Sequence, residues 1–133
     1  MTPAGPAGAP RPTSTDARPT AEHEKGTRMD PQTAHERRDE VLLLDVREQD
    51  EWDAGHIEGS LHIPMDELAA RQSELPQDRP IVAVCRTGRR SAAVTEALSR
   101  AGYDAHNLVG GVAEWQGQDL PLVDEDGDPG VVA

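Results

Sequence analysis

Short apolar runs separated by segments of helical spacing restrict this chain to a small group of folds. Two runs, at residues 41–44 and 81–84, are continuous, which is typical of strands buried on both faces of a sheet. Two shorter strands and two helices are predicted at residues 61–63, 105–109, 65–73 and 90–101. Strands that alternate with helices predict an α/β domain with a mainly parallel sheet.

The two ends of the chain differ in composition from this central part. Residues 1–28 are rich in Pro, Ala, Gly and Thr, and we predict a disordered tail. The folded domain is expected over residues 29–123, beginning with a short helix from Asp30 to Arg38. Residues 124–133 open with an acidic run that resembles the start of a calcium loop, but we interpret them as a flexible, solvated tail.

Charge and cysteine content exclude several classes of function. The formal net charge is −12, which argues against binding to nucleic acids or to an anionic membrane. No run is long and apolar enough for a secretory signal or a membrane span, so a cytoplasmic location is expected. The single cysteine, Cys85, excludes an intramolecular disulfide and a four-cysteine metal site. No cofactor and no metal are expected.

Cys85 directly follows the predicted strand at residues 81–84 and precedes a predicted helix. Backbone N–H groups at a strand-to-helix turn, together with the positive end of the helix dipole, form a site for an anion. Three arginines, Arg86, Arg89 and Arg90, lie in the same loop of an otherwise acidic chain. Gly88 is expected to take a positive φ that turns successive N–H groups inward. The loop therefore predicts a stabilised thiolate and a small anionic ligand.

A second set of charged residues lies near the end of the first predicted strand. We interpret Asp45, Arg47 and Glu51 as an ion-pair network that braces the loops beside the site rather than as an acid/base pair. His56 lies in a turn between two glycines and is interpreted as a structural, hydrogen-bonded histidine.

Three ordered motifs resemble the signatures of the rhodanese family. They are residues 44–64 with Asp45, Arg47 and the Gly55-His56-Ile57 turn, the loop at residues 85–91, and residues 110–121 with Gly110-Gly111 and Trp115. The resemblance covers about residues 30–123. It implies a single-domain sulfurtransferase with a three-layer α/β/α fold, a central mainly parallel sheet of four to five strands and a persulfide on Cys85. The polar region before Val41 departs from the family pattern, so the sequence does not identify the strand at the edge of the sheet.

The resemblance also gives the loop residues their roles. Cys85 is the expected nucleophile, and the donor, thiosulfate or a related small sulfur anion, is expected to bind to the rest of the loop, namely Arg86, Thr87, Gly88, Arg89, Arg90 and Ser91. Arg90 is the best placed to close the site, and Arg89 is expected to be the most exposed. Because no second cysteine can resolve a persulfide, the acceptor must be external: cyanide, a thiol or a partner protein.

Two other functions fit parts of the pattern. The domain could carry a persulfide to one partner protein with little turnover of free thiosulfate. Cysteine phosphatases and arsenate reductases also place a cysteine and an arginine around an anion loop, but the phosphatase pattern has five residues between them. Here only four residues separate Cys85 from Arg90, and position 91 is serine. The smaller loop favours a sulfur-centred donor over a phosphate ester.

Overall fold

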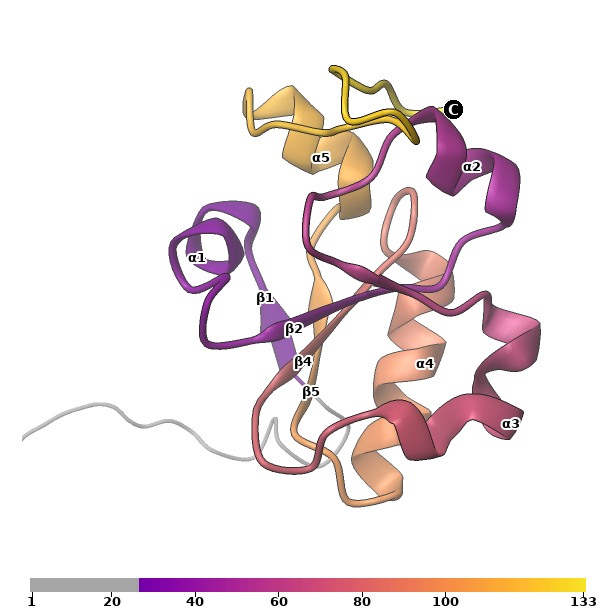
Figure 1. Ribbon diagram of the computed structural model, residues 1–133. Helices are drawn as coiled ribbons and strands as arrows, with labels where there is room; N and C mark the ends of the chain where they lie inside the picture. Colours follow the sequence, from indigo (N-terminus) through magenta and orange to yellow (C-terminus); the bar gives the residue numbers. More distant parts are fainter. Residues whose placement is uncertain (1–26) are drawn as a thin grey trace, which may run out of the picture.

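A five-stranded sheet forms the centre of the protein (Figure 1). The computed structural model describes residues 27–133. The strand order is β1-β5-β4-β2-β3, and all neighbouring strands are parallel. The strands are β1 (Thr27–Met29), β2 (Leu42–Asp45), β3 (Leu61–His62), β4 (Ile81–Val84) and β5 (Ala105–Leu108). The predicted α/β fold with a mainly parallel sheet is therefore confirmed.

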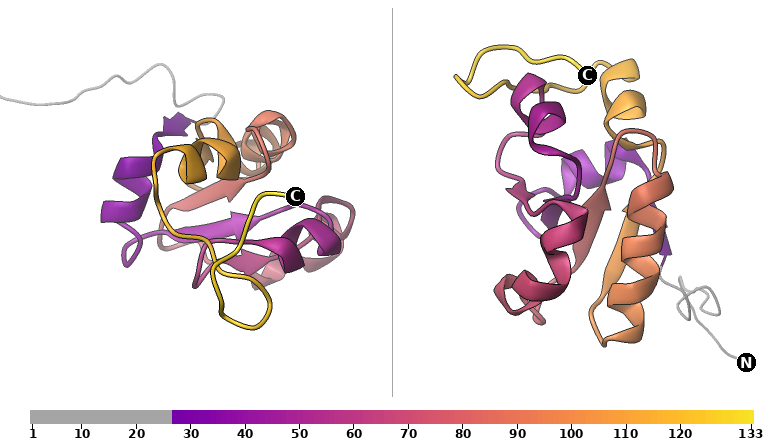
Figure 2. Two further views of the ribbon diagram at one scale, coloured as in Figure 1. Left: turned by 90° about the horizontal axis from the view of Figure 1, so that it is seen from above. Right: turned by 90° about the vertical axis from the view of Figure 1, so that its right-hand side faces the viewer.

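Helices cover both faces of the sheet, as the two views of Figure 2 show. Helices α3 and α4 pack on one face, and α1 and α5 on the other, so that the fold has three layers. The helices are α1 (Pro31–Glu36), α2 (Gln49–Ala54), α3 (Leu68–Arg71), α4 (Arg89–Arg100) and α5 (Gly111–Gly117). Short 3-10 turns, η4 (Met65–Glu67) and η5 (Gln72–Glu74), flank α3.

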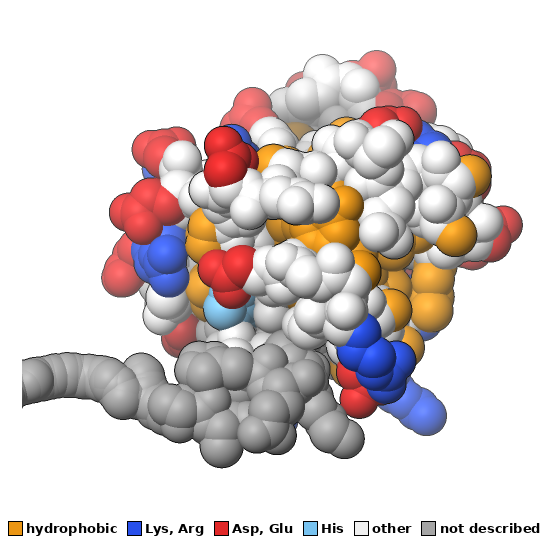
Figure 3. Space-filling model, turned by 90° about the horizontal axis from the view of Figure 1, so that it is seen from below, with side chains coloured by type: hydrophobic (Ala, Val, Ile, Leu, Met, Phe, Trp, Pro, Cys, Tyr) orange, Lys and Arg blue, Asp and Glu red, His pale blue; other side chains and the backbone are white. Residues whose placement is uncertain are grey.

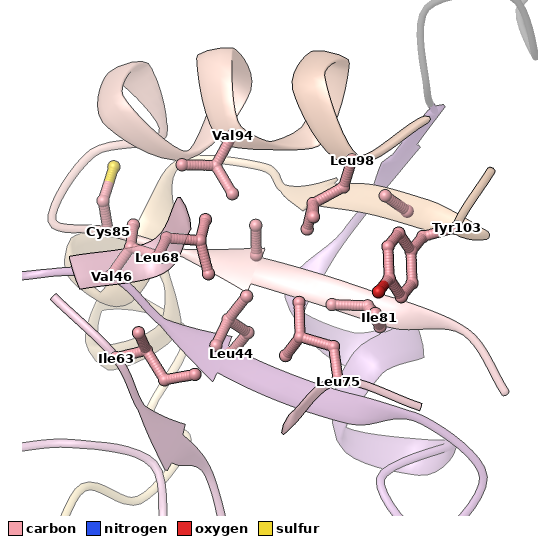
Figure 4. Close-up of a cluster of buried hydrophobic side chains, with 12 residues drawn as sticks. Leu44, Val46, Ile63, Leu68, Leu75, Ile81, Cys85, Val94, Leu98 and Tyr103 are labelled. Atoms are coloured by element: carbon pink, nitrogen blue, oxygen red, sulfur yellow. The ribbon is translucent and has the colours of Figure 1, made fainter. Parts of the chain in front are cut away.

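Strand β4 contributes side chains to two hydrophobic cores, one on each face of the sheet. All four of its residues are buried, and successive side chains point to opposite faces. Ile81 and Ala83 pack with Cys85 against α4, whereas Val82 and Val84 pack against the side of α1 and α5. In Figure 4, Cys85 lies at the end of the first cluster, with its sulfur directed toward the start of α4. The alternation along β4 therefore sends the thiol toward α4.

The sheet begins two residues before the predicted domain boundary. Thr27 and Arg28, assigned to the disordered tail, form β1 with Met29 and pair with β5. Hydropathy gave no signal for this strand, because only the Met29 side chain is buried and backbone hydrogen bonds to β5 supply the rest. Residues 1–26 of the predicted tail lie outside the described residues.

The acidic segment at residues 124–133 folds back onto the domain, although the sequence predicts a flexible tail there. Val123 forms backbone bridges with His56 and Pro129, and the Val131 N–H donates to the Ala54 carbonyl at 3.0 Å. Asp124 Oδ1 accepts the backbone N–H groups of residues 126 and 128, both at 2.9 Å. The polar composition concealed this order, because side-chain-to-backbone bonds, rather than apolar contacts, shape the turn.

Figure 3 shows the side of the molecule on which the strands begin. Acidic side chains lie around much of the margin of this side. Within residues 27–133, no helix combines the length and the hydropathy needed to cross a membrane.

The start of α5 supports the loop that carries Cys85. The N–H groups of Val112 and Ala113 donate to the Cys85 and Arg86 carbonyls, both at 2.9 Å. This approach requires glycine at position 111, where φ is +62° and an added Cβ would lie 2.4 Å from the Cys85 carbonyl oxygen.

Gly111→Ala should therefore destabilise the domain and displace the loop. Gly102→Ala is the matched control, because Gly102 also has a positive φ, +98°, but an added Cβ there meets nothing within 4 Å. We expect Gly111→Ala to reduce the free energy of unfolding by about 1–3 kcal/mol more than the control. Urea denaturation measures both values, and equal losses would contradict the role of this contact.

Candidate active site

Three hydrogen-bond donors surround the sulfur of Cys85 at the carboxyl end of β4. The Gly88 N–H lies 3.1 Å from Sγ, the Ser91 N–H 3.4 Å and the Ser91 hydroxyl oxygen 3.3 Å. Gly88 has a φ of +100°, as expected, and this left-handed turn brings the loop into the first turn of α4. The donors converge on one atom, which is the arrangement that stabilises an anion on sulfur.

The surroundings of the thiol act on its pKa in opposite directions. Burial raises the pKa of Cys85, whose exposed fraction is only 1%. The Ser91 hydroxyl and the N–H groups of Ser91, Gly88 and Thr87 lower it, and the pKa lies below its ordinary value. The hydrogen bonds thus outweigh the cost of burial.

The three arginines of the loop have different positions. Arg86 is exposed, and its Nε donates to the Ala133 backbone oxygen at 3.1 Å. Arg89 is exposed, as expected. Arg90 does not reach into the site as a free cation: its two terminal nitrogens each lie 2.9 Å from an oxygen of Glu51. A carboxylate from α2 binds the Arg90 guanidinium, and the role of Arg90 in closing the site stays a prediction.

The expected network of Asp45, Arg47 and Glu51 is two separate ion pairs. Arg47 binds Asp45 through Nε and Nη2, at 2.9 and 2.8 Å, and both residues are fully buried. Arg47 Nη2 also donates to the Gly55 carbonyl at 2.7 Å, so this pair joins β2 to the end of α2. Glu51 binds Arg90 instead, and hydrogen bonds from Arg90 lower the pKa of Glu51 to about 2. Both pairs brace loops beside the thiol.

His56 makes structural contacts. Its Nδ1 donates to the Trp52 carbonyl at 2.8 Å, and its ring stacks on the Trp52 ring with a centroid distance of 3.6 Å. Its backbone pairs with Val123. These contacts hold the turn after α2, in keeping with the structural interpretation.

Asn107 was absent from the residues predicted for the site. It lies in β5, and its side chain contacts both Gly88 and Ser91. An asparagine inside a short strand is unusual, because Asn is depleted in strands, and this departure could have drawn attention to it.

One cluster of acidic groups could attract a cation. Ligand oxygens of Asp124, Asp126 and Asp128 lie within 4.8 Å of one another. Exposed acidic clusters of this kind are common on protein surfaces, and we assign no metal to it.

The fold and the site together define a parallel α/β domain that places a cysteine thiol among hydrogen-bond donors at a strand-to-helix turn. The family model of the rhodanese-like domain matches residues 30–118, and the chain belongs to this family. A sulfurtransferase of Allochromatium vinosum is 39% identical over 90 residues, which cover 67% of this chain and 84% of that protein. A putative sulfur carrier protein of Bacillus subtilis is 38% identical over 82 residues, 60% of this chain and 44% of that protein.

Solved structures show the same fold. A rhodanese-related protein of Thermoplasma volcanium superposes with a TM-score of 0.72 at 32% identity, covering 74% of this chain and 99% of that one. A rhodanese-like domain protein of Staphylococcus aureus has a TM-score of 0.65 at 27% identity and covers 80% and 99%.

The Glu51–Arg90 pair predicts how the free energy of unfolding depends on pH. The pKa of Glu51 is about 2 in the folded protein against an ordinary value of 4.5, so the pair stabilises the fold above that ordinary value. This contribution is lost as the pH falls from the ordinary value through the folded one. In Glu51→Gln, the free energy of unfolding should depend less on pH over this interval, as measured by urea denaturation at each pH.

Glu67→Gln is the control for this experiment. Glu67 pairs with Arg71 but its side chain is 52% exposed, and exposed pairs contribute little. We expect the free energy of unfolding of Glu67→Gln to depend on pH as it does in the wild type. A Glu51→Gln curve as steep as the wild-type curve would show that the pair does not stabilise the fold.

Proposed function

We propose that this domain transfers sulfane sulfur through a persulfide on Cys85. The observation that carries the proposal is the convergence of the Gly88 and Ser91 donors on Sγ. Such a site stabilises the thiolate before it attacks the donor. The names of several relatives, among them the sulfurtransferase of Allochromatium vinosum, support the same chemistry.

The reaction has two steps. The Cys85 thiolate attacks the outer sulfur of thiosulfate or a related donor; the sulfur–sulfur bond of the donor breaks, and sulfite leaves with the bonding electrons. The new persulfide carries its negative charge on the outer sulfur. A thiophilic acceptor, cyanide or a thiolate, then takes that sulfur, and the electron pair returns to Sγ. Because this sequence has one cysteine, the acceptor comes from outside it.

A second candidate function is that of a persulfide carrier for a partner protein in a reducing compartment such as the cytoplasm. The observation that favours it is the pairing of Arg90 with Glu51, which leaves less positive charge for a doubly charged donor. A relative is named as a putative sulfur carrier protein. The phosphatase alternative loses support, because the residue at the arginine position of that pattern is Ser91, fully buried against Sγ.

Incubation with thiosulfate should add one sulfur atom to Cys85. Intact-mass and peptide mass spectrometry would locate the addition, and cyanide should then remove it as thiocyanate. Cys85→Ser should keep the fold and gain no sulfur. An unchanged mass, with a thiol that still reacts with alkylating reagents, would reject thiosulfate as the donor and favour transfer from a protein or small-molecule persulfide.

Substitutions of Arg90 and Glu51 should change the KM for thiosulfate in opposite directions. Arg90→Ala removes a cation and leaves the Glu51 charge beside the site, so the KM for thiosulfate should rise about tenfold. Glu51→Gln releases Arg90 from its partner, and the KM should fall. Arg89→Ala is the control, because Arg89 is exposed, and its effect should be smaller. Steady-state formation of thiocyanate measures all three values, and equal effects at positions 89 and 90 would contradict this assignment.

A further inference from the structure

Asn107 contacts the active-site loop, yet the sulfur chemistry described above gives it no role. Its side-chain nitrogen donates to the Gly88 carbonyl at 3.0 Å. Its Oδ1 lies 2.5 Å from the Ser91 hydroxyl oxygen. A carbonyl oxygen can only accept hydrogen bonds, so the contact with Gly88 fixes which end of the amide faces Ser91. Asn107 therefore presents an acceptor to that hydroxyl.

The Ser91 hydroxyl has one proton and two acceptors within reach. Cys85 Sγ lies 3.3 Å from the hydroxyl oxygen, and Asn107 Oδ1 lies on its other side. When Cys85 is a neutral thiol, its S–H can donate to the Ser91 oxygen while Ser91 donates to Asn107, so every group is paired. When Cys85 is a thiolate, Ser91 must turn its proton toward Sγ. Asn107 Oδ1 then loses its donor, which has a cost at a partly buried position.

We propose that Asn107 is a positioning residue that directs the Ser91 hydroxyl and thereby favours the states in which Sγ itself carries no charge. These states are the thiol and the persulfide, and this inference therefore rests on the function proposed above. In the persulfide the charge lies on the outer sulfur, so Ser91 is free to donate to Asn107 again. The thiol proton leaves to solvent on ionisation, whereas the Ser91 proton stays on its own oxygen and changes only its direction.

This arrangement has a consequence for the sulfur-transfer step. Asn107 raises the free energy of the thiolate relative to the states before and after it. A thiolate that is less stabilised is less populated but more nucleophilic, and attack on the donor moves its charge away from Sγ. Without Asn107, the thiolate would form at lower pH and each thiolate would react more slowly.

The elements around the thiol carry other charged or titratable side chains, namely Asp45, Arg47, Glu51, His62, Arg86, Arg89, Arg90 and Glu114. The two ion pairs, Asp45–Arg47 and Glu51–Arg90, involve no atom of Asn107. A change in the ionisation of Cys85 on substitution of Asn107 is therefore assigned to the Ser91 hydroxyl or to the Gly88 carbonyl, and a double variant separates these two.

The test is the rate of alkylation of Cys85 by iodoacetamide as a function of pH, which requires no sulfur donor. Asn107→Leu keeps the approximate size of the side chain and removes its acceptor, so the midpoint of the profile should move to lower pH by several tenths of a unit. Asn107→Asp keeps an acceptor, carries a negative charge and should move the midpoint to higher pH. The opposite signs distinguish this role from general loosening of the loop.

The same substitutions in a Ser91→Ala background show whether Asn107 acts through the hydroxyl. There, Asn107→Leu should leave the midpoint where Ser91→Ala alone puts it. Thr95→Val is the matched control: Thr95 lies one turn further along α4 and donates to the Ser91 carbonyl at 2.8 Å, and the structure gives its hydroxyl no contact with Sγ. We expect the control to leave the midpoint unchanged.

Two results would overturn the proposal: an unchanged or higher midpoint in Asn107→Leu, or a shift that persists in full without the Ser91 hydroxyl. If Asn107→Leu does not fold, a midpoint in Asn107→Asp at or below that of the wild type overturns it as well. Failure of the sulfur-transfer function is a separate result, because it appears as the absence of a persulfide while the alkylation profiles keep their predicted order.

Discussion

The hydrogen bonds to Cys85 Sγ are the interaction on which the rest of the site depends. A charged sulfur with almost no exposure to solvent is unfavourable unless protein donors replace water. The donors are available because β4 ends at Val84, directly before Cys85, while Gly88 takes a left-handed conformation and α4 begins with the next residue. The start of α5 binds carbonyl groups of the active-site loop, so the N–H groups of that loop remain directed at the sulfur. The placement of β4, α4 and α5 thus determines the chemistry of this sulfur atom.

Local sequence was sufficient for the central elements. The β-branched run at Ile81–Val84 gave β4 with its observed bounds, and the predicted positive φ at Gly88 is present. These features follow from the residues themselves, because side-chain shape and backbone freedom decide them over a few positions. The same reasoning located the thiol at the carboxyl end of a parallel strand, where binding sites of such sheets form.

Features that depend on distant residues were not accessible in this way. Glu51 and Arg90 lie 39 positions apart, and no local pattern indicates that they pair. Asn107 reaches the loop only because β5 lies beside β4 in the sheet. Strand β1 depends on backbone pairing with β5, which leaves little trace in side-chain hydropathy. Each of these requires the topology first, and a single sequence gives topology less directly than it gives the elements.

The course of the C-terminal segment has a practical consequence. After the bridges of Val123 to His56 and Pro129, the segment ends at Ala133, whose backbone oxygen accepts a hydrogen bond from Arg86 of the active-site loop. A peptide or domain joined to this end would start at the Arg86 side chain of the active-site loop. Its effective concentration there would reach the millimolar range for a short linker, whatever its intrinsic affinity. The geometry thus makes this end of the domain a natural point for attaching a sulfur acceptor in cis.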